Sequence, residues 1–430
     1  MRGLSVFSDT ERIQSRYKRL APFGVTPFFV PDGKHLPLFA AAFVIVSCRR
    51  LAMERVAETA LRVKTVIAGA DVFAGDGILG SLPVTVAQLL EDGLIFLLYD
   101  NGTEEIAKSV CEDLKGYGFR VSAHDIAENY RAEEYCRLAL GVGAGKVAEE
   151  TKRVAKCLGV ECVLVVTAPS TDCYLRGGGV KQVYLDGHVL DCCPTQCTAA
   201  GWGILLSAPV TRFENYFNEK VLAFARGGKS SAEVPTTECD NTELALRLLE
   251  YGACNCDDGA SDEVARLLAA IAVEKGKKPR LHGEYKFLAA CTLSVFYSSF
   301  LSSPAIDTLP PADHDGALEE LSRLTGTPRE KLVHSFDFFD VNSYFRINYI
   351  LSEYRLDLLE RLSTLDLRSS QRRWRRLYED AGYWLSGALT ARDMLRAMSL
   401  AGETCKGLLN YAVAAGFCRR LVSPAKEKAA

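Results

Sequence analysis

The sequence predicts an α/β domain with a parallel sheet, followed by a domain made of helices. Short apolar runs typical of strands alternate with helix-like runs between about residues 63 and 194. Strand signals stop near residue 195, and apolar residues then recur at every third or fourth position. A chain of 430 residues is also longer than one compact core usually holds, which favours more than one domain.

The first part contains short apolar segments that are separated by turn residues and amphipathic segments. The expected strands are 65–69, 94–100, 119–125 and 161–166, and a helix is expected over 104–118. Strands that alternate with helices in this way form parallel sheets, whose ligands bind at the carboxyl ends of the strands. Asp100, residues 141–146 and residues 167–172 should therefore lie along one edge of the sheet.

The second part contains segments with a helical apolar period that begin at caps or end at glycines. The expected helices are 242–252, 261–276, 283–301, 315–326, 345–365 and 391–416. These patterns divide the chain into an N-terminal extension over 1–62, an α/β domain over 63–194 and a helical domain over 195–424. The cleft between the two domains is the expected site.

Composition excludes several classes of partner. The net charge is −3, so there is no large basic field and nucleic acid is not expected as the main partner. The apolar run 36–48 is about half as long as a membrane-spanning helix, so no membrane anchor is expected. The 15 cysteines lack the dense spacing of a disulfide scaffold, which indicates reduced thiols and a cytoplasmic protein. A small-molecule substrate and a homo-oligomer are compatible with this composition.

The stretch GVGAGK, residues 141–146, has glycines where a strand is expected to feed a helix. Glycines at such a joint let backbone N–H groups approach a phosphate, and the helix N-terminus favours negative charge. The same glycines also occur in ordinary strand–helix joints, and the GxGxxG spacing is not met. Thr167 and Ser170, at the next strand end, favour the phosphate-binding interpretation because their hydroxyls could meet the same ligand.

Four motifs in order resemble those of the iron-containing alcohol dehydrogenase and dehydroquinate synthase superfamily. They are GVGAGKVAEETK (141–152), TAPSTD (167–172), DCCPTQCTAAGWGILLS (191–207) and KPRLHGEYK (278–286). The second motif is similar to a segment of the glycerol and glycerol-1-phosphate dehydrogenases of this superfamily. The resemblance covers roughly residues 65–420 and implies an NAD(P)-dependent dehydrogenase that uses a divalent metal, namely zinc, nickel or iron.

The resemblance also implies roles for individual residues in the α/β domain. The glycine turn would bind the dinucleotide pyrophosphate, with Asp100 near the adenosine ribose, where a carboxylate favours a free 2′-hydroxyl. The segment 167–172 would lie on the nicotinamide side, where Asp172 would help to hold the substrate. The residues implied in cofactor binding are Asp100, Gly143, Ala144, Gly145, Lys146, Thr167 and Ser170.

The metal site implied by the resemblance is incomplete in this sequence. The superfamily normally uses one Asp and two His, which polarise the substrate oxygen through the metal. His282 matches one ligand and Asp262 stands at the position of the second histidine, but Ile204 occupies the position of the aspartate. Two ligands hold a divalent ion weakly unless a further carboxylate joins, such as Asp172, Glu263 or Glu284.

Three functions remain open at this level. The first is a dehydrogenase of a small polyol or polyol phosphate, nearest to sn-glycerol-1-phosphate dehydrogenase and hence to phospholipid metabolism, with Asp172 and His282 as catalytic residues. The second is a nucleotide-binding homologue without turnover, and the third is a sugar-phosphate cyclase. If the substrate carries a phosphate, Lys286 is the expected cation, because it follows His282 by four residues and shares its helical face.

Overall fold

The computed structural model describes most of the chain from Lys64 onward. The chain divides into two compact units, 1–63 and 64–430, and every described residue belongs to the second unit. The predicted extension over 1–62 therefore lies outside the described residues. The described ranges are 64–90, 93–131, 135–222, 239–254, 259–303, 313–334, 341–365, 389–405 and 407–422, with residues 367, 369, 370, 372 and 374.

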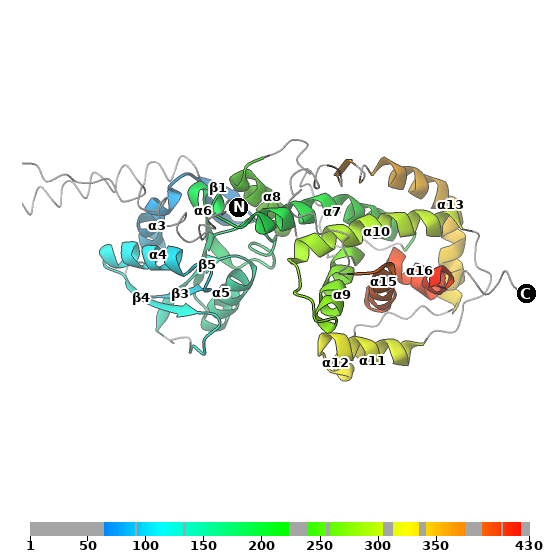
Figure 1. Cartoon of the computed structure of the whole chain (residues 1–430). Coiled ribbons are helices and arrows are strands. Elements are labelled where there is room, and N and C mark those ends of the chain that lie inside the picture. Colours follow the sequence, from blue (N-terminus) through cyan, green and yellow to red (C-terminus); the bar gives the residue numbers. More distant parts are fainter. Residues whose placement is uncertain are drawn as a thin grey trace, which may run out of the picture. The chain divides into compact units, whose positions relative to one another are not determined.

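A seven-stranded sheet has the order β1-β2-β7-β6-β5-β3-β4. Strands β1, β3, β4 and β5 of this sheet are labelled in Figure 1. Neighbouring strands are parallel except β1 and β2, which form an antiparallel pair. The predicted fold class, a mostly parallel α/β sheet followed by helices, is thus confirmed. The strands are β1 Lys64–Ile67, β2 Ala70–Gly75, β3 Leu94–Tyr99, β4 Arg120–Asp125, β5 Cys136–Gly143, β6 Glu161–Val166 and β7 Val180–Asp186.

Helices α4 (Glu104–Gly116) and α5 (Gly145–Leu158) pack on strands of this sheet. The buried face of α5 carries Val147, Ala148, Val154 and Ala155, which join the apolar core of the sheet. Helix α5 ends at Gly159 in the left-handed conformation, with φ of 66°, a backbone that glycine adopts without steric cost. The smaller helical elements beside this sheet are η1 Ile78–Ser81, α3 Leu82–Leu89 and α6 Gly187–Leu190.

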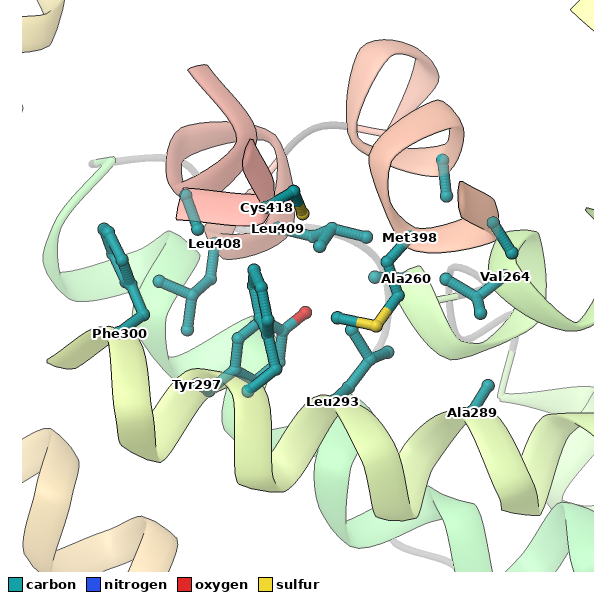
Figure 2. Close-up of a cluster of buried hydrophobic side chains, with 14 of the residues drawn as sticks. Ala260, Val264, Ala289, Leu293, Tyr297, Phe300, Met398, Leu408, Leu409 and Cys418 are labelled. Atoms are coloured by element: carbon teal, nitrogen blue, oxygen red, sulfur yellow. The ribbon is translucent and has the colours of Figure 1, made fainter. Parts of the chain in front are cut away.

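After α6, the described elements are all helical, and most of them build a second apolar core. In Figure 2, Leu293 and Tyr297 of α10 (His282–Ser302) point toward Met398 of α15 (Ala391–Thr404), and Val264 of α9 (Ala260–Glu274) belongs to the same apolar cluster. Helix α7 (Thr195–Lys220) runs beside α10. The other helices are α8 Asn241–Ala253, α11 His314–Thr325, α12 Arg329–Val333, α13 Val341–Thr364, α16 Leu408–Ala414 and α17 Phe417–Val422.

The structure differs from the sequence-based expectation in three helices. The segment expected as one helix over 391–416 is two helices, because the chain turns at Gly407 with φ of 129°. Helix α8, expected in the helical domain, packs Ala245 and Leu249 into the apolar core of the sheet. The 26-residue helix α7 was not among the expected helices, since it is buried on almost every side and shows no amphipathic period. None of the described helices is long and apolar enough to span a membrane.

Candidate functional site

The glycine turn joins β5 to α5 at the carboxyl edge of the sheet. Gly141 and Gly143 still belong to β5, so the turn proper is shorter than expected and is formed by Ala144 and Gly145. The N-cap residue of α5 is Ala144, whose side chain makes no hydrogen bond to the first backbone N–H groups of the helix. Lys146 lies in the first turn of α5 and is exposed. This arrangement can bind an anionic group.

Two glycines of the turn have different environments. A Cβ atom added at Gly143 would lie 2.6 Å from Cγ2 of Val147, so this glycine is required for α5 to approach β5. A Cβ atom added at Gly145 would meet only Cγ2 of Thr171, at 3.9 Å. Internal packing therefore explains Gly143, whereas Gly145 borders open space next to the segment after β6.

Asp100 follows β3 at the same edge, as predicted. The hydroxyl of Thr103 contacts Asp100 Oδ1 at 3.1 Å and donates to the carbonyl oxygen of Val142 at 2.8 Å. Thr103 thus ties the turn after β3 to the end of β5. The sequence analysis missed this residue, although Asp-Asn-Gly-Thr is a typical turn in which the fourth side chain contacts the first.

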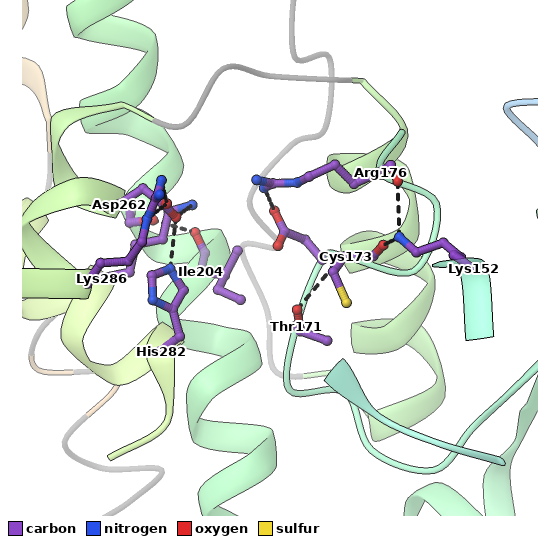
Figure 3. A network of polar contacts seen from close by, with 11 residues as sticks. Lys152, Thr171, Cys173, Arg176, Ile204, Asp262, His282 and Lys286 are labelled. Carbon is purple, nitrogen blue, oxygen red and sulfur yellow. Dashed lines mark hydrogen bonds and ion pairs between the residues drawn. The ribbon is translucent and has the colours of Figure 1, made fainter. Parts of the chain in front are cut away.

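The segment Thr167–Asp172 follows β6, next to the glycine turn. The backbone N–H of Thr167 donates to the carbonyl oxygen of Gly143 at 3.4 Å, and Gly143 pairs with Val166 in the sheet. The expected meeting of these two segments at one sheet edge is therefore observed. Asp172 is buried and its carboxylate is paired with Arg176. Beyond it, Lys152 of α5 donates to the carbonyl oxygens of Cys173 and Arg176, which fixes this turn (Figure 3).

Helix α7 connects this segment to the N-terminus of α10. A Cβ atom added at Gly201 would lie 2.0 Å from the carbonyl oxygen of Pro169, and one added at Gly203 would lie 2.2 Å from that of Gly283. Helix α7 is thus in close backbone contact with the segment after β6 at Gly201, and with the residue after His282 at Gly203. This explains the glycines of the GWG triplet as close-packing residues.

His282 and Asp262 come together at the start of two helices. His282 Nε2 is 2.8 Å from Asp262 Oδ1, and Lys286 Nζ is 3.0 Å from the same oxygen. The side chain of His282 is 41% exposed, whereas those of Asp262 and Lys286 are 7% and 1% exposed. Figure 3 shows these three side chains together, with Ile204 beside them. The predicted shared face of His282 and Lys286 is observed, since both reach one carboxylate oxygen.

The other oxygen of Asp262 is also occupied. Arg266 donates to Oδ2 from Nη2 at 2.8 Å and from Nε at 3.1 Å. Burial by itself raises the pKa of the Asp262 carboxyl, but the Lys286 ammonium, the His282 hydrogen bond and the Arg266 guanidinium together hold this pKa well below its usual range. Asp262 is therefore an ionised carboxylate with three basic partners. The sequence analysis missed Arg266, which the four-residue spacing on a helix could have indicated.

The described residues do not fit a divalent metal ion at this place. Among them, no group of three or more His, Cys, Asp or Glu side chains is arranged to hold a metal. Ile204, at the position of the expected aspartate, is 1% exposed and brings an apolar side chain. The other candidate carboxylates have basic partners: Asp172 pairs with Arg176, Glu263 with Arg266, and Glu284 with Arg280. The implied ligands His282 and Asp262 do meet, but in direct contact with each other.

Comparison with known proteins gives structural neighbours only. No protein-family model matches the chain, and no curated protein matches it. Among solved structures, the chain is similar to glycerol dehydrogenase from Schizosaccharomyces pombe, with 14% identity over 73% of this chain and 91% of that one and a TM-score of 0.42. It is also similar to a 1,3-propanediol oxidoreductase, with 12% identity over 81% of this chain and 97% of that one and a TM-score of 0.46. The chain is similar as well to an iron-containing alcohol dehydrogenase, with 14% identity over 82% of this chain and 98% of that one and a TM-score of 0.43.

Proposed function

We propose that the chain is an NAD(P)-dependent oxidoreductase of a small polyol or polyol phosphate, with sn-glycerol-1-phosphate dehydrogenation as the nearest activity. The observation that supports this most is the position of the segment Thr167–Asp172. This segment adjoins the glycine turn, because the backbone N–H of Thr167 donates to the carbonyl oxygen of Gly143. The same segment packs closely against Gly201 of α7, and Gly203 of α7 packs closely against Gly283, the residue after His282. We therefore propose that one connected set of segments contacts both a cofactor on the glycine turn and a substrate near His282.

The proposed cofactor contacts follow from the chemistry at the sheet edge. The backbone N–H groups at Gly145 and Lys146 suit a pyrophosphate, because they start a helix whose N-cap residue, Ala144, makes no side-chain hydrogen bond to them. Asp100, fixed by Thr103, suits a ribose with a free 2′-hydroxyl and so favours NAD over NADP. Thr167 and Ser170 are proposed on the nicotinamide side.

The proposed reaction passes a hydride between the nicotinamide and a substrate carbon, while the substrate oxygen loses or gains a proton. His282 is proposed to face that oxygen, since its ring is half-exposed and its Nε2 is held by Asp262. Asp172 is proposed to orient the substrate from the other side. The phosphate-binding role of Lys286 stays a prediction, and its ammonium already has Asp262 as a partner.

The test is NADH and NADPH titration, followed by assays with dihydroxyacetone and dihydroxyacetone phosphate. We expect wild-type protein to bind and consume NADH. His282→Gln should retain NADH binding within about twofold and lose about 10²–10⁴-fold in kcat. A matched control is His314→Gln, because His314 is also half-exposed and lies 2.8 Å from a carboxylate, that of Glu403. Equal losses in the two variants would contradict the role of His282.

A second candidate is a nucleotide-binding protein without turnover. The observation that favours it is Ile204, together with the basic partners that occupy the nearby carboxylates. Binding of NADH without consumption of any tested carbonyl compound would support this alternative.

A further inference from the structure

The carboxylates that the resemblance offers as metal ligands share one feature, which is a basic partner close by in sequence. Three of these pairs have a spacing of four residues: Asp172 with Arg176, Asp262 with Arg266, and Glu284 with Arg280. Lys286 adds a second cation to Asp262 and is itself almost fully buried, with 1% of its side chain exposed. The charge of these carboxylates is therefore balanced by the chain itself.

Partners from the chain itself occupy both oxygens of the Asp262 carboxylate. His282 Nε2 lies 2.8 Å from Oδ1, and Arg266 donates to Oδ2 from Nη2 and Nε. The same Oδ1 accepts from the Lys286 ammonium at 3.0 Å. A divalent ion bound to this oxygen would lie close to the buried ammonium and would be repelled by it.

Ile204 lies on the neighbouring helix, α7. Its side chain is buried beside the group formed by Asp262, His282 and Lys286 (Figure 3). An aspartate there would be a ligand oxygen for a hard or borderline cation, whereas an isoleucine offers none. The loss of a ligand and the presence of an internal cation thus occur at the same place.

We propose that the Lys286 ammonium is the resident cation of this site and takes the place of the divalent metal ion that the resemblance implies. Lys286 acts as a positioning residue: with Arg266 it fixes the Asp262 carboxylate, which in turn orients the imidazole of His282. The inference goes beyond the proposed function and does not depend on turnover, because metal binding is measured on the protein itself.

The experiment is titration of the full chain with Co²⁺, whose visible absorption separates thiolate ligands from nitrogen and oxygen ligands. This probe is needed because the chain has 15 cysteines that can bind metals elsewhere. We expect wild-type protein and His282→Gln to give the same Co²⁺ titration. One Co²⁺ per chain that is lost in His282→Gln would overturn the proposal.

A gain-of-binding variant tests the role of Lys286 directly. Lys286→Met with Ile204→Asp removes the ammonium and supplies the missing carboxylate, so we expect a Co²⁺ site that depends on His282 and is at least about 10-fold tighter than in wild type. The matched control is Lys275→Met, which takes an ammonium from the buried carboxylate of Asp393 and should create no site. No gain in a double variant with a native circular dichroism spectrum would overturn the proposal.

If the double variant does not fold, the Co²⁺ titrations of wild type and His282→Gln still test the inference, because they need no substitution of a buried residue. Failure of the proposed function would appear as NADH binding without consumption. Failure of this inference would appear as a metal site that requires His282. The two results are therefore distinguishable.

Discussion

Lys286→Met removes a buried ammonium and should lower the stability of the protein. Methionine keeps much of the side-chain volume in a position that is 1% exposed, so the main loss is the ammonium 3.0 Å from Asp262 Oδ1. Removal of one partner of a buried ion pair costs about 3–5 kcal/mol when the other charge is left uncompensated. Asp262 still has His282 and Arg266, so we expect a smaller loss, about 2–3 kcal/mol in the free energy of unfolding.

The assay is urea unfolding of wild type and variant, followed by circular dichroism, with the m-value as a check on the two end states. The control is Lys108→Met, which removes an ammonium that is 58% exposed and should change stability much less than Lys286→Met does. Adding Asp262→Asn should make Lys286→Met less costly than in wild type, because the unpaired carboxylate is gone. Equal losses for Lys286→Met and Lys108→Met would refute the ion pair as a stabilising contact.

Three further predictions concern acid stability and the glycine turn. The pKa of Asp262 is lowered on folding, so its stabilising contribution is complete above about pH 5 and is lost as the pH falls below that; urea unfolding should show wild type losing about 1 kcal/mol more than Asp262→Asn between about pH 5 and 3. Gly143→Ala should lower the free energy of unfolding by about 1–3 kcal/mol, because the added Cβ would lie 2.6 Å from Val147, and a change below about 0.5 kcal/mol would show that α5 can shift. Gly145→Ala should leave stability within about 0.5 kcal/mol and weaken NADH binding, and unchanged NADH affinity would place the pyrophosphate elsewhere.

The sequence was informative about the fold where burial is one-sided or where strands are wholly apolar. The amphipathic period of α4 and α5 and the apolar run of β6 identify these elements directly. Strand β7 was missed because its buried residues include polar side chains, such as Gln182 at 2% exposure. Helix α7 was missed for the opposite reason, since burial on nearly all sides removes the period that marks a helix.

The sequence indicated several residues of the candidate site, but few of the contacts between them. The spacing of His282 and Lys286 indicated one helical face, and the order of the strands indicated that Asp100 and the glycine turn share an edge. The pairing of Asp262 with Lys286 was not predictable, because these residues lie on different helices and their distance depends on how α9 and α10 pack. Ile204 in the sequence indicated that one metal ligand is missing. Only the structure showed that the Lys286 ammonium lies next to the Asp262 carboxylate.

The central claim is that dinucleotide-linked reduction occurs at His282 without a bound metal. The most direct measurement is NADH consumption with dihydroxyacetone phosphate by the full chain, in the presence of a strong chelator and again with added Zn²⁺. We predict the same rate in both conditions and its loss in His282→Gln. A rate that vanishes with the chelator and returns with Zn²⁺ would contradict the claim, as would NADH binding with no consumption in either condition.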